Sequence, residues 1–439
     1  DTRLNGTSNS SSTRGKVTAG NVNLTVSEDG KVLSGKTVHP AFCIPWGTYF
    51  NSNMYFYAEL DKPLRVQAEG STVNTVTNGA ALLQYDLTEA DPTLTMRVGI
   101  SSVSVENAKL NLQTENPSST FDQVRQAADA EWNARLNTVQ IDRASDPSAL
   151  TPEQRADLTK FYTALYRVFV SPTTYSDVNG DYRSMRAPKP FPTAVDVTGG
   201  VAERTTENVA DDAFTRLDGS TGTPKAHYSG LSMWDTYRSA AQALSLFAPD
   251  VSSDVMQSLV ADAEQCGAFP HWVDGSDDST PMAGDNALAV LAASYAFGAT
   301  DFDLKTAARY VKQSVFDPTS ICNNNSSSAN LSQYLEYGYR PTGAAGQPAS
   351  SNIEQNAADH AAGVFLNALP AQILNDPSVD VTDADIAKLN DRSTWWKNIF
   401  NYDTGVIAQR AAPTTPGTLG TLQTGVFHES TEPNYFWSF

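Results

Sequence analysis

The stretch STFDQVRQAADAEWNARL, residues 119–136, marks the point at which the periodicity of the sequence changes. Upstream of it, apolar and polar residues alternate, which is the period of a half-buried strand. The stretch itself opens on a Ser/Thr cap and repeats apolar residues at helical spacing, and helical segments follow it. Runs of strands followed by runs of helices predict two domains rather than interleaved strand–helix–strand units.

The upstream part predicts a β-sandwich. Four stretches carry the alternation: VNLTVSEDGKVL, MYFYAELDKPLRVQAEG, NTVTNGAALLQYDL and TLTMRVGISSVSV. Asp-Gly, Asn-Gly and Pro supply the turn signals. Short strands with such turns are typical of a sandwich, which we place in residues 1–118. Residues 1–15 are polar and rich in Ser, so we expect part of this start to be disordered.

The downstream part predicts a series of helices. In LTPEQRADLTKFYTALYRVFV, Thr151 is a cap candidate and Pro152 stands at the first helical turn. Further helices are expected in LSMWDTYRSAAQALSLF, SDVMQSLVADAEQ, GDNALAVLAASYAFG, LKTAARYVKQSVF and IEQNAADHAAGVFLNALPAQIL. Long loops with aromatic and acidic residues separate them, so an α/α toroid fits better than a short-loop bundle. We assign residues 119–150 to a linking helix and residues 151–439 to the helical domain.

Composition excludes several kinds of partner. Asp and Glu total 49 against 30 for Lys and Arg, which gives a net charge of −19. Nucleic acids and anionic membrane surfaces attract basic faces, so neither is an expected partner. No apolar run approaches the ~18 residues of a membrane span. No signal peptide is visible either, so we expect that any such peptide has been removed.

Sequons and cysteines favour a secreted, extracellular glycoprotein. The N-x-[ST] acceptors lie in polar stretches and are Asn5, Asn9, Asn23, Asn324, Asn325 and Asn330. The competing interpretation is a set of chance matches in a Ser/Thr-rich bacterial secreted protein. The three cysteines allow one disulfide, which we expect between Cys266 and Cys322 in the helical half, with Cys43 left over.

The segment GLSMWDTYR places Trp234 beside Asp235, with Arg238 one turn later. An indole face next to a carboxylate suits a sugar ring, whose C–H face stacks on the indole while its hydroxyls bond the carboxylate. The competing interpretation is an ordinary helix start, with Trp234 in the core and Asp235 paired with Arg238. The pattern alone favours this second interpretation.

Two loop-like stretches, CGAFPHW and MAGDNALAV, interrupt the helical series. They place His271, Trp272, Asp285 and Asn286 at helix edges, where binding sites are often built on a rigid scaffold. Capping of the following helix by Asp285 explains the second stretch at least as well.

The stretch SNIEQNAADHAAGVF carries Glu354, Asp359 and His360 on a helix that is otherwise small and apolar. Its Ala and Gly content indicates close helix packing, so buried charges there would need partners. The competing interpretation is a capped helix whose polar edge faces water.

The stretch SDVNGDYR has Asp177, Asn179 and Asp181 at alternate positions, as at the start of a calcium loop. Pro188 stands where an EF-hand has its twelfth-position Glu, so a tight acidic turn is the favoured interpretation. The sequence contains no Gly-rich phosphate loop, no G-x-S-x-G elbow and no H-E-x-x-H motif.

The C-terminal stretch FHESTEPNYFW sets Glu429 and Glu432 among aromatic residues. A general acid near neutral pH needs a raised pKa, and apolar surroundings raise a carboxyl pKa by desolvation. The competing interpretation is an exposed loop with no role.

Several of these stretches together resemble glycoside hydrolase family 92. In the family's order and rough spacing the sequence contains FYTALYRVFVSPTTYSDVNGDYR, HYSGLSMWDTYRS, GAFPHW, MAGDNA, NIFNYDTGVIAQR and HESTEPNYFW. The resemblance extends from about residue 54 to the end of the chain. It implies an N-terminal β-sandwich packed on an (α/α)6 barrel. It also implies a calcium-dependent, inverting exo-α-mannosidase that releases terminal α-linked mannose from N-glycans or mannan.

The resemblance also implies residue roles. The family's general acid lies in a motif like E-G-N-x-W-Q-Y-x-W, and aligning Tyr435 and Trp437 with the end of that motif puts Glu429 on the acid. Trp234 and Asp235 fall on positions expected to hold the terminal mannose. The full set of candidate substrate-binding residues is Trp234, Asp235, Trp272, Asp285 and Glu354.

The sequence departs from the family in several places. Ser430 and Thr431 replace the Gly-Asn that follows the acid, and Pro433 and Asn434 stand in the Trp-Gln positions. SNIEQNAADH keeps both carboxylates of an E-Y-x-x-x-D-like stretch but lacks its aromatic. The family's G-N-E-P segment, tied to calcium, and its G-N-D-D-x-G segment, with the catalytic base, are absent and would follow residue 439.

Inversion needs two carboxyl groups about 6.5–9.5 Å apart, one as acid and one as base. Glu429 is a credible acid, whereas Asp359 and Asp285 are weak substitutes for a base. We therefore expect the base and the calcium ligands on polypeptide that this chain does not contain, and no metal ligand within it. That polypeptide could be a second chain that completes the catalytic domain.

Two other functions remain open at this point. The changed residues around Glu429 motivate a catalytically inactive mannan- or mannose-binding protein of the same fold. A family member that acts on mannose-1-phospho-6-mannose would also tolerate them, since a phosphate leaving group needs less help from an acid. The presence of Glu429 counts against this last function.

Overall fold

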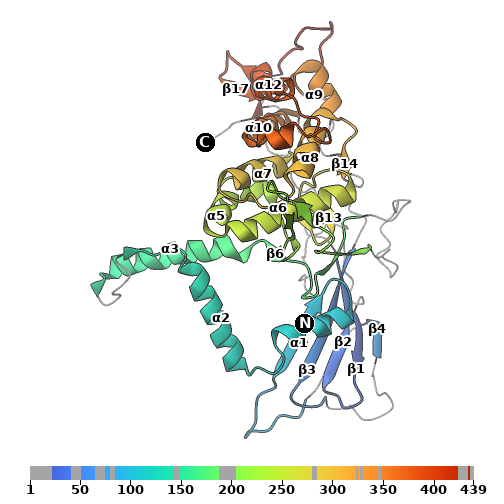
Figure 1. Cartoon of the computed structure of the whole chain (residues 1–439), viewed down its shortest axis with the longest axis vertical. Helices are drawn as coiled ribbons and strands as arrows, with labels where there is room; N and C mark the ends of the chain where they lie inside the picture. Colours follow the sequence, from blue (N-terminus) through green and yellow to red (C-terminus); the bar gives the residue numbers. More distant parts are fainter. Residues whose placement is uncertain are drawn as a thin grey trace.

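A computed structural model describes residues 22–40, 51–64, 75–79, 85–142, 149–186, 204–278, 284–322, 325–326, 330–343, 348–423 and 434–435. The described chain is elongated (Figure 1). A β-sheet lies at one end, a stack of helices lies at the other, and a helical arm projects sideways between them.

The N-terminal strands form one antiparallel sheet with the order β4-β1-β2-β3-β5. Its strands are β1 (Val22–Val26), β2 (Val32–Pro40), β3 (Asn51–Leu60), β4 (Thr75–Gly79) and β5 (Met96–Ser101). The predicted Asp-Gly turn joins β1 to β2, and Gly30 there has φ +70. Alternate side chains point to one side, as the period-2 pattern requires. The buried members of that set are Leu24, Leu33, Phe56, Ala58 and Leu60.

Helix α1 (Val105–Glu115) packs on this sheet. Gly99 of β5 permits the close approach, because a Cβ there would lie 2.0 Å from the carbonyl oxygen of Ala108. Within the described residues the sheet therefore meets a helix, and the predicted sandwich is not confirmed. The change from strand to helix also comes earlier than residue 119, since α1 already begins at Val105.

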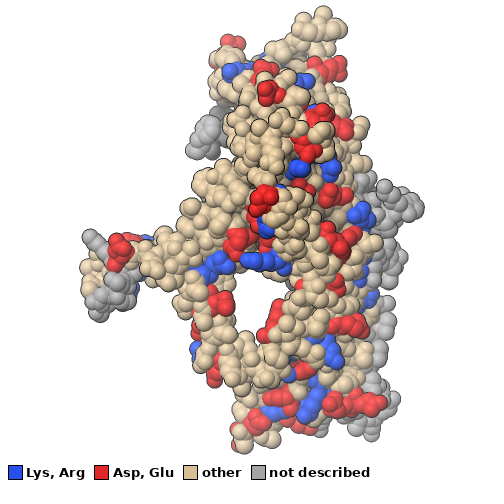
Figure 2. Space-filling model, in the orientation of Figure 1, with Lys and Arg blue, Asp and Glu red and all other residues tan. Residues whose placement is uncertain are grey.

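The arm consists of α2 (Phe121–Leu136) and α3 (Pro152–Val170). Both begin with a capping box, built on Thr120 and on Thr151, and this confirms the two predicted helix starts. Helix α2 buries none of its residues, and the side chain of Phe121 is 73% exposed. Figure 2 shows an opening between α2 and the rest of the molecule.

The helical part has its core where α5 (Ala240–Phe247), α6 (Pro249–Cys266), α7 (Asn286–Ala296), α8 (Leu304–Phe316) and α10 (Pro348–Ala368) meet. These helices confirm the predicted segments, except that two of them divide. LSMWDTYRSAAQALSLF divides into α4 (Met233–Thr236) and α5, and IEQNAADHAAGVFLNALPAQIL divides into α10 and α11 (Ala371–Leu374) at Pro370. The remaining helices are α9 (Leu331–Tyr337), α12 (Asp383–Arg392) and the 3-10 helix η3 (Trp395–Ile399). A closed (α/α)6 ring stays a prediction.

Short ribbons connect the helices. The paired strands are β6 (Thr173–Thr174) with β11 (Tyr228–Ser229), β7 (Asp181–Arg183) with β8 (Thr206–Asn208), β9 (Phe214–Thr215) with β10 (Thr221–Gly222), β12 (Val273–Asp274) with β13 (Asp277–Asp278), and β14 (Ile321–Cys322) with β15 (Asn325–Ser326). A three-stranded sheet contains β16 (Phe400–Asn401), β17 (Val406–Ala408) and β18 (Asn434–Tyr435). The predicted disulfide joins Cys266 to Cys322 and links the end of α6 to β14.

A buried polar cluster around Asp177 joins the sheet to the helical part. Its carboxylate accepts hydrogen bonds from Ser101 Oγ (2.6 Å) on β5 and from Asn107 Nδ2 (2.8 Å) and Asn111 Nδ2 (2.7 Å) on α1. The amide oxygen of Asn111 accepts from the backbone N–H of Val178 (3.0 Å) in return. Both carboxylate oxygens of Asp177 are thus satisfied, as buried polar groups usually are.

None of the described helices is long and apolar enough to cross a membrane.

Candidate active site

The segment before Trp234 is held against the segment after Trp272. Leu231 and Val273 exchange two backbone hydrogen bonds, of 3.0 and 3.2 Å. Met233, at the start of α4, is 1% exposed and anchors that short helix in the core. The predicted site segments around Trp234 and Trp272 are therefore brought together by backbone pairing.

The indole of Trp234 is half-buried and contacts two charged groups. Its Nε1–H donates to Oε1 of Glu354 on α10 (3.2 Å). The guanidinium of Arg238 lies over the indole ring, 4.2 Å from its centroid, and over the Tyr237 ring at 4.4 Å. Such stacking is a favourable cation–π contact. One face of the indole is thus covered, and its N–H is already used.

The predicted pairing of Asp235 with Arg238 is wrong. Arg238 stacks on aromatic rings and donates to the carbonyl oxygen of Trp234 instead. Asp235 is exposed, and no hydrogen bond or ion pair holds its carboxylate within the described part of the chain. The segment does begin a helix, with Asp235 in its first turn, as the competing interpretation requires, so the sugar-binding role of Trp234 and Asp235 stays a prediction.

Glu354 is buried in α10 beside Gly284. A Cβ at position 284 would lie 2.8 Å from the Cβ of Glu354, and Gly284 has φ +95, so only glycine fits there. Burial raises the pKa of Glu354, and the bond from Trp234 and the charge of Arg238 offset this only in part. The competing interpretation, a polar helix edge in water, is wrong for Glu354.

Asp285 stands at the N-cap position of α7 but makes no side-chain cap. Its side chain is 3% exposed, and neither carboxylate oxygen has a hydrogen-bond partner among the described residues. Ser314 lies close enough to lower the pKa of Asp285, although its hydroxyl and the carboxylate do not meet hydrogen-bonding geometry. Burial raises the pKa of Asp285 to about 7, and His271 opposes this rise less strongly. The capping interpretation of Asp285 is therefore wrong.

Asp278 organises the loop that carries Trp272. One oxygen accepts hydrogen bonds from the backbone N–H groups of His271 (3.1 Å) and Trp272 (3.2 Å). The other lies 3.1 Å from Nδ1 of His271. Trp272 itself is half-buried. The sequence analysis did not single out Asp278, because nothing local distinguishes it from the other carboxylates of VDGSDD.

Asp359 does not fit the role of a substitute base. It forms an ion pair with Arg392 in which both side chains are 0% exposed. Arg392 Nε donates to Oδ2 of Asp359 (3.0 Å), as does the hydroxyl of Tyr334 (2.7 Å). A base that activates water must reach water, so this carboxylate is a structural group.

Glu429 lies outside the described residues, as do Glu432, Asn5, Asn9 and Asn324. Nearby, β18 pairs with β17 through Tyr435 and Ile407, and it also contacts α10. Residues 434–435 therefore lie against the helix that carries Glu354. The assignment of Glu429 as acid stays a prediction, and so do the glycosylation sites, including Asn23, Asn325 and Asn330.

The turn SDVNGDYR does not fit a calcium ion. Asp181 accepts hydrogen bonds from Nδ2 of Asn107 (3.1 Å), Asn179 (2.7 Å) and Asn208 (2.8 Å). Burial alone would raise the pKa of Asp181, but these amide donors outweigh it and lower the pKa. Side chains that present N–H groups to the carboxylates leave no oxygen cage of the kind that calcium prefers.

Among the described residues, no group of three or more His, Cys, Asp or Glu could hold a metal ion. The expected calcium ligands beyond this chain stay a prediction.

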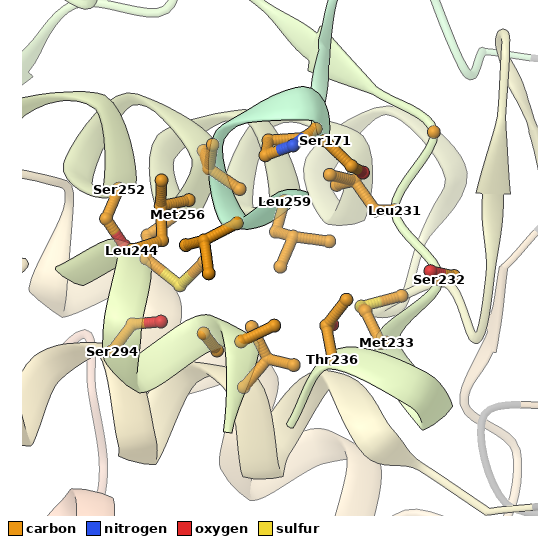
Figure 3. Close-up of a pocket in the computed structure, with 17 residues that line it drawn as sticks. Ser171, Leu231, Ser232, Met233, Thr236, Leu244, Ser252, Met256, Leu259 and Ser294 are labelled. Atoms are coloured by element: carbon orange, nitrogen blue, oxygen red, sulfur yellow. The ribbon is translucent and has the colours of Figure 1, made fainter. Parts of the chain in front are cut away.

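A cavity of about 50 Å³ lies on the core side of α4 (Figure 3). Its lining is mostly apolar and includes Leu231, Met233, Leu244, Met256 and Leu259. A space of this size has room for a few water molecules only. It is a packing space beside Met233 and Thr236 of α4, too small for a sugar ring.

Comparison with known proteins places the chain in a family. Residues 107–439 match the family described as glycosyl hydrolase family 92 catalytic domain. No curated protein matches the chain.

Solved structures share the fold. The family 92 α-mannosidase BT3965 from Bacteroides thetaiotaomicron aligns with a TM-score of 0.69 and 20% identity, over 94% of this chain and 49% of its own. The inverting mannosidase BT2199 from Bacteroides thetaiotaomicron VPI-5482 aligns with a TM-score of 0.66 and 18% identity, over 94% of this chain and 50% of its own. The chain thus spans about half the length of these relatives. At such identities the likeness establishes the fold.

Proposed function

Because the chain belongs to glycosyl hydrolase family 92, we propose that it carries the sugar-binding side of an exo-α-mannosidase site. The substrate is a terminal α-linked mannose of an N-glycan or mannan. The observation that carries this proposal is the family match over residues 107–439, a range that includes every candidate catalytic and substrate-binding residue. A structure of BT3965 in complex with mannoimidazole supports the choice of sugar.

The geometry supports two different roles for the site residues, stacking on the sugar ring and hydrogen bonding to its hydroxyls. The half-buried indole of Trp234 would stack on the C–H face of the sugar. The exposed carboxylate of Asp235 and the unpartnered carboxylate of Asp285 would accept hydrogen bonds from sugar hydroxyls. A site that hydrogen-bonds particular hydroxyls strongly rejects a sugar that lacks them, because its buried polar groups are then left unpaired.

In the proposed reaction Glu429 donates a proton to the leaving oxygen. A second carboxylate activates water on the opposite face of the ring, and the product is inverted. The contact of β18 with α10, the helix that carries Glu354, is consistent with this role for Glu429. We assign the base to polypeptide beyond this chain, either a continuation or a second polypeptide. Calcium is the cofactor that we propose for the complete site, with its ligands on the same further polypeptide.

Mannose release by the complete protein tests this function. We expect Glu429→Gln to lower kcat/KM on natural α-mannosides by about 100-fold or more, because general acid catalysis contributes about that much. Glu432→Gln is the matched control, three residues away, and should keep most of the activity. NMR of the first product should detect β-mannose, and chelation followed by calcium addition should abolish and restore release. Full activity of the Glu429→Gln variant would refute the acid assignment.

The binding-protein alternative makes a different prediction in the same experiment. The replacements at Ser430, Thr431, Pro433 and Asn434 favour it, because they alter the surroundings of the acid. A protein that binds α-mannosides but releases no mannose, even with calcium, would support this alternative. Turnover that is retained on mannose-1-phospho-6-mannose only would point to the phosphodiester substrate.

We also propose that the protein is secreted and N-glycosylated. The Cys266–Cys322 disulfide supports an oxidising compartment. Peptide mass spectrometry of the protein from its own source should find glycans on at least one of the six sequons. Six unmodified asparagines would contradict the glycoprotein assignment.

A further inference from the structure

The contacts of Trp234 restrict how a ligand can reach it. The indole N–H is donated to Glu354, and the guanidinium of Arg238 lies 4.2 Å from the ring centroid. A ligand can therefore neither accept a hydrogen bond from the indole nor stack on the covered face unless Arg238 moves. The opposite face is the part of this half-buried ring that remains for stacking.

The contacts of Glu354 restrict its own role. Its carboxylate lies in the interior between α10, the indole of Trp234 and the backbone at Gly284, where a side chain would collide with it. The bond from Trp234 connects residues that are 120 positions apart in the sequence. Removing one partner of this part-buried hydrogen bond leaves the other unsatisfied, which is costly. The indole orientation and the Glu354 carboxylate thus depend on one another.

We propose that Glu354 is a positioning residue: it fixes the plane of the Trp234 indole so that one face is presented to the C–H face of the terminal sugar. This inference rests on the proposed function, and it replaces direct sugar binding as the role of Glu354. The guanidinium of Arg238 stacks on the indole face that is turned away from the proposed sugar position. Gly284 leaves the space in which the Glu354 carboxylate lies. Because the indole N–H is already donated to Glu354, the arrangement favours sugars that stack a continuous C–H face on the ring over ligands that need a hydrogen bond from the indole.

The matched pair Glu354→Gln and Glu354→Leu tests the hydrogen bond. Glutamine keeps an oxygen that accepts from the indole N–H, whereas leucine has a similar volume and no acceptor. In ¹⁵N NMR spectra we expect the Trp234 indole N–H signal to stay near its wild-type position in Glu354→Gln. In Glu354→Leu it should shift and lose protection from exchange. This readout needs no sugar, so it remains informative even if the proposed function fails.

A double-mutant cycle with Trp234→Phe separates positioning from direct contact. Phenylalanine can stack on a sugar but has no N–H to donate. We expect Glu354→Leu to weaken mannoimidazole binding by about tenfold in the wild-type background and by less than about twofold in the Trp234→Phe background. With substrate, the loss should lie mainly in KM. Circular dichroism and the Glu354→Gln variant control for misfolding.

Two results would overturn the proposal. One is an equal loss of binding on Glu354→Leu in both backgrounds, which would mean that Glu354 contacts the sugar itself. The other is an unchanged indole N–H signal in Glu354→Leu. A wild-type protein that binds no mannoside, with the indole signal shifting as expected, would contradict the proposed function and leave the Glu354–Trp234 contact intact.

Discussion

Two buried aspartates of this chain have opposite surroundings. Asp177, at the junction of sheet and helices, accepts hydrogen bonds from Ser101, Asn107 and Asn111. Asp285, at the start of α7, is as well buried as Asp177, but its two oxygens have no partner among the described residues. Asp359 resembles Asp177, because Arg392 and Tyr334 satisfy it.

The difference separates structural from functional carboxylates. A satisfied buried carboxylate holds elements in place, and removing it leaves several donors without partners. An unsatisfied one costs stability in the free protein and can regain its hydrogen bonds when a polar ligand binds. We therefore expect changes at Asp177 and Asp359 to affect stability first, and changes at Asp285 to affect binding first.

The largest effect is expected from breaking the Asp359–Arg392 ion pair. Arg392→Met leaves a fully buried carboxylate without its cation, which typically costs about 3–5 kcal/mol of unfolding free energy. Urea denaturation measures the loss. The double variant Asp359→Leu with Arg392→Met should lose less than either single variant, since no lone charge remains. A loss under about 1 kcal/mol in the Arg392→Met variant would contradict the structural role of this pair.

A smaller loss is expected at the junction. Asp177→Ala leaves three donors unsatisfied and should cost about 2–3 kcal/mol. Hydrogen exchange should localise the loss to β5, α1 and the loop before β7. Asp181→Ala serves as a comparison within the same cluster: that carboxylate shares the donor Asn107 but is less buried than Asp177, so its removal should cost less. Equal protection in wild type and Asp177→Ala would argue against a junction role.

The raised pKa of Asp285 predicts that folding stability falls as pH rises, whereas a paired aspartate with a lowered pKa makes stability rise with pH. The pKa of Asp285 is about 7 in the folded chain, against 3.8 for an unperturbed aspartate. The folded chain therefore holds a proton that the unfolded chain releases, so the wild type loses stability as pH rises from about 4 to about 7. Asp285→Asn cannot titrate. Its stability relative to wild type should rise steadily across that range and then level off.

Urea denaturation of both proteins in matched buffers measures this difference. Asp254→Asn is a useful comparison, because burial raises the pKa of Asp254 to about 6 on α6, outside the site. A difference between Asp285→Asn and wild type that does not change with pH would mean that Asp285 is paired or hydrated.

The sequence predicts best what depends on neighbouring residues. Thr120 and Thr151 are followed by Gln at the third helical position, so both capping boxes could be recognised locally. The disulfide between Cys266 and Cys322 followed from their shared place in the helical half. The polar helix of Glu354 was also recognised as one that needs partners when buried.

The sequence could not reveal which partners the buried groups have. The bond between Trp234 and Glu354 and the ion pair between Asp359 and Arg392 depend on how distant helices pack. Capping was the better local interpretation of Asp285, because an unpartnered carboxylate has no sequence signal. The second sheet of the predicted sandwich is not among the described residues, where helix α1 covers the sheet instead.

Calorimetric titration with mannoimidazole above pH 7 tests the central claim most directly, because Asp285 is then charged and able to accept hydrogen bonds from a sugar. We predict that Asp285→Asn keeps the fold and weakens binding by about tenfold, or about 1.4 kcal/mol, while Asp254→Asn binds like the wild type. Equal affinity of wild type and Asp285→Asn would contradict the claim that the unpartnered carboxylate marks the sugar site.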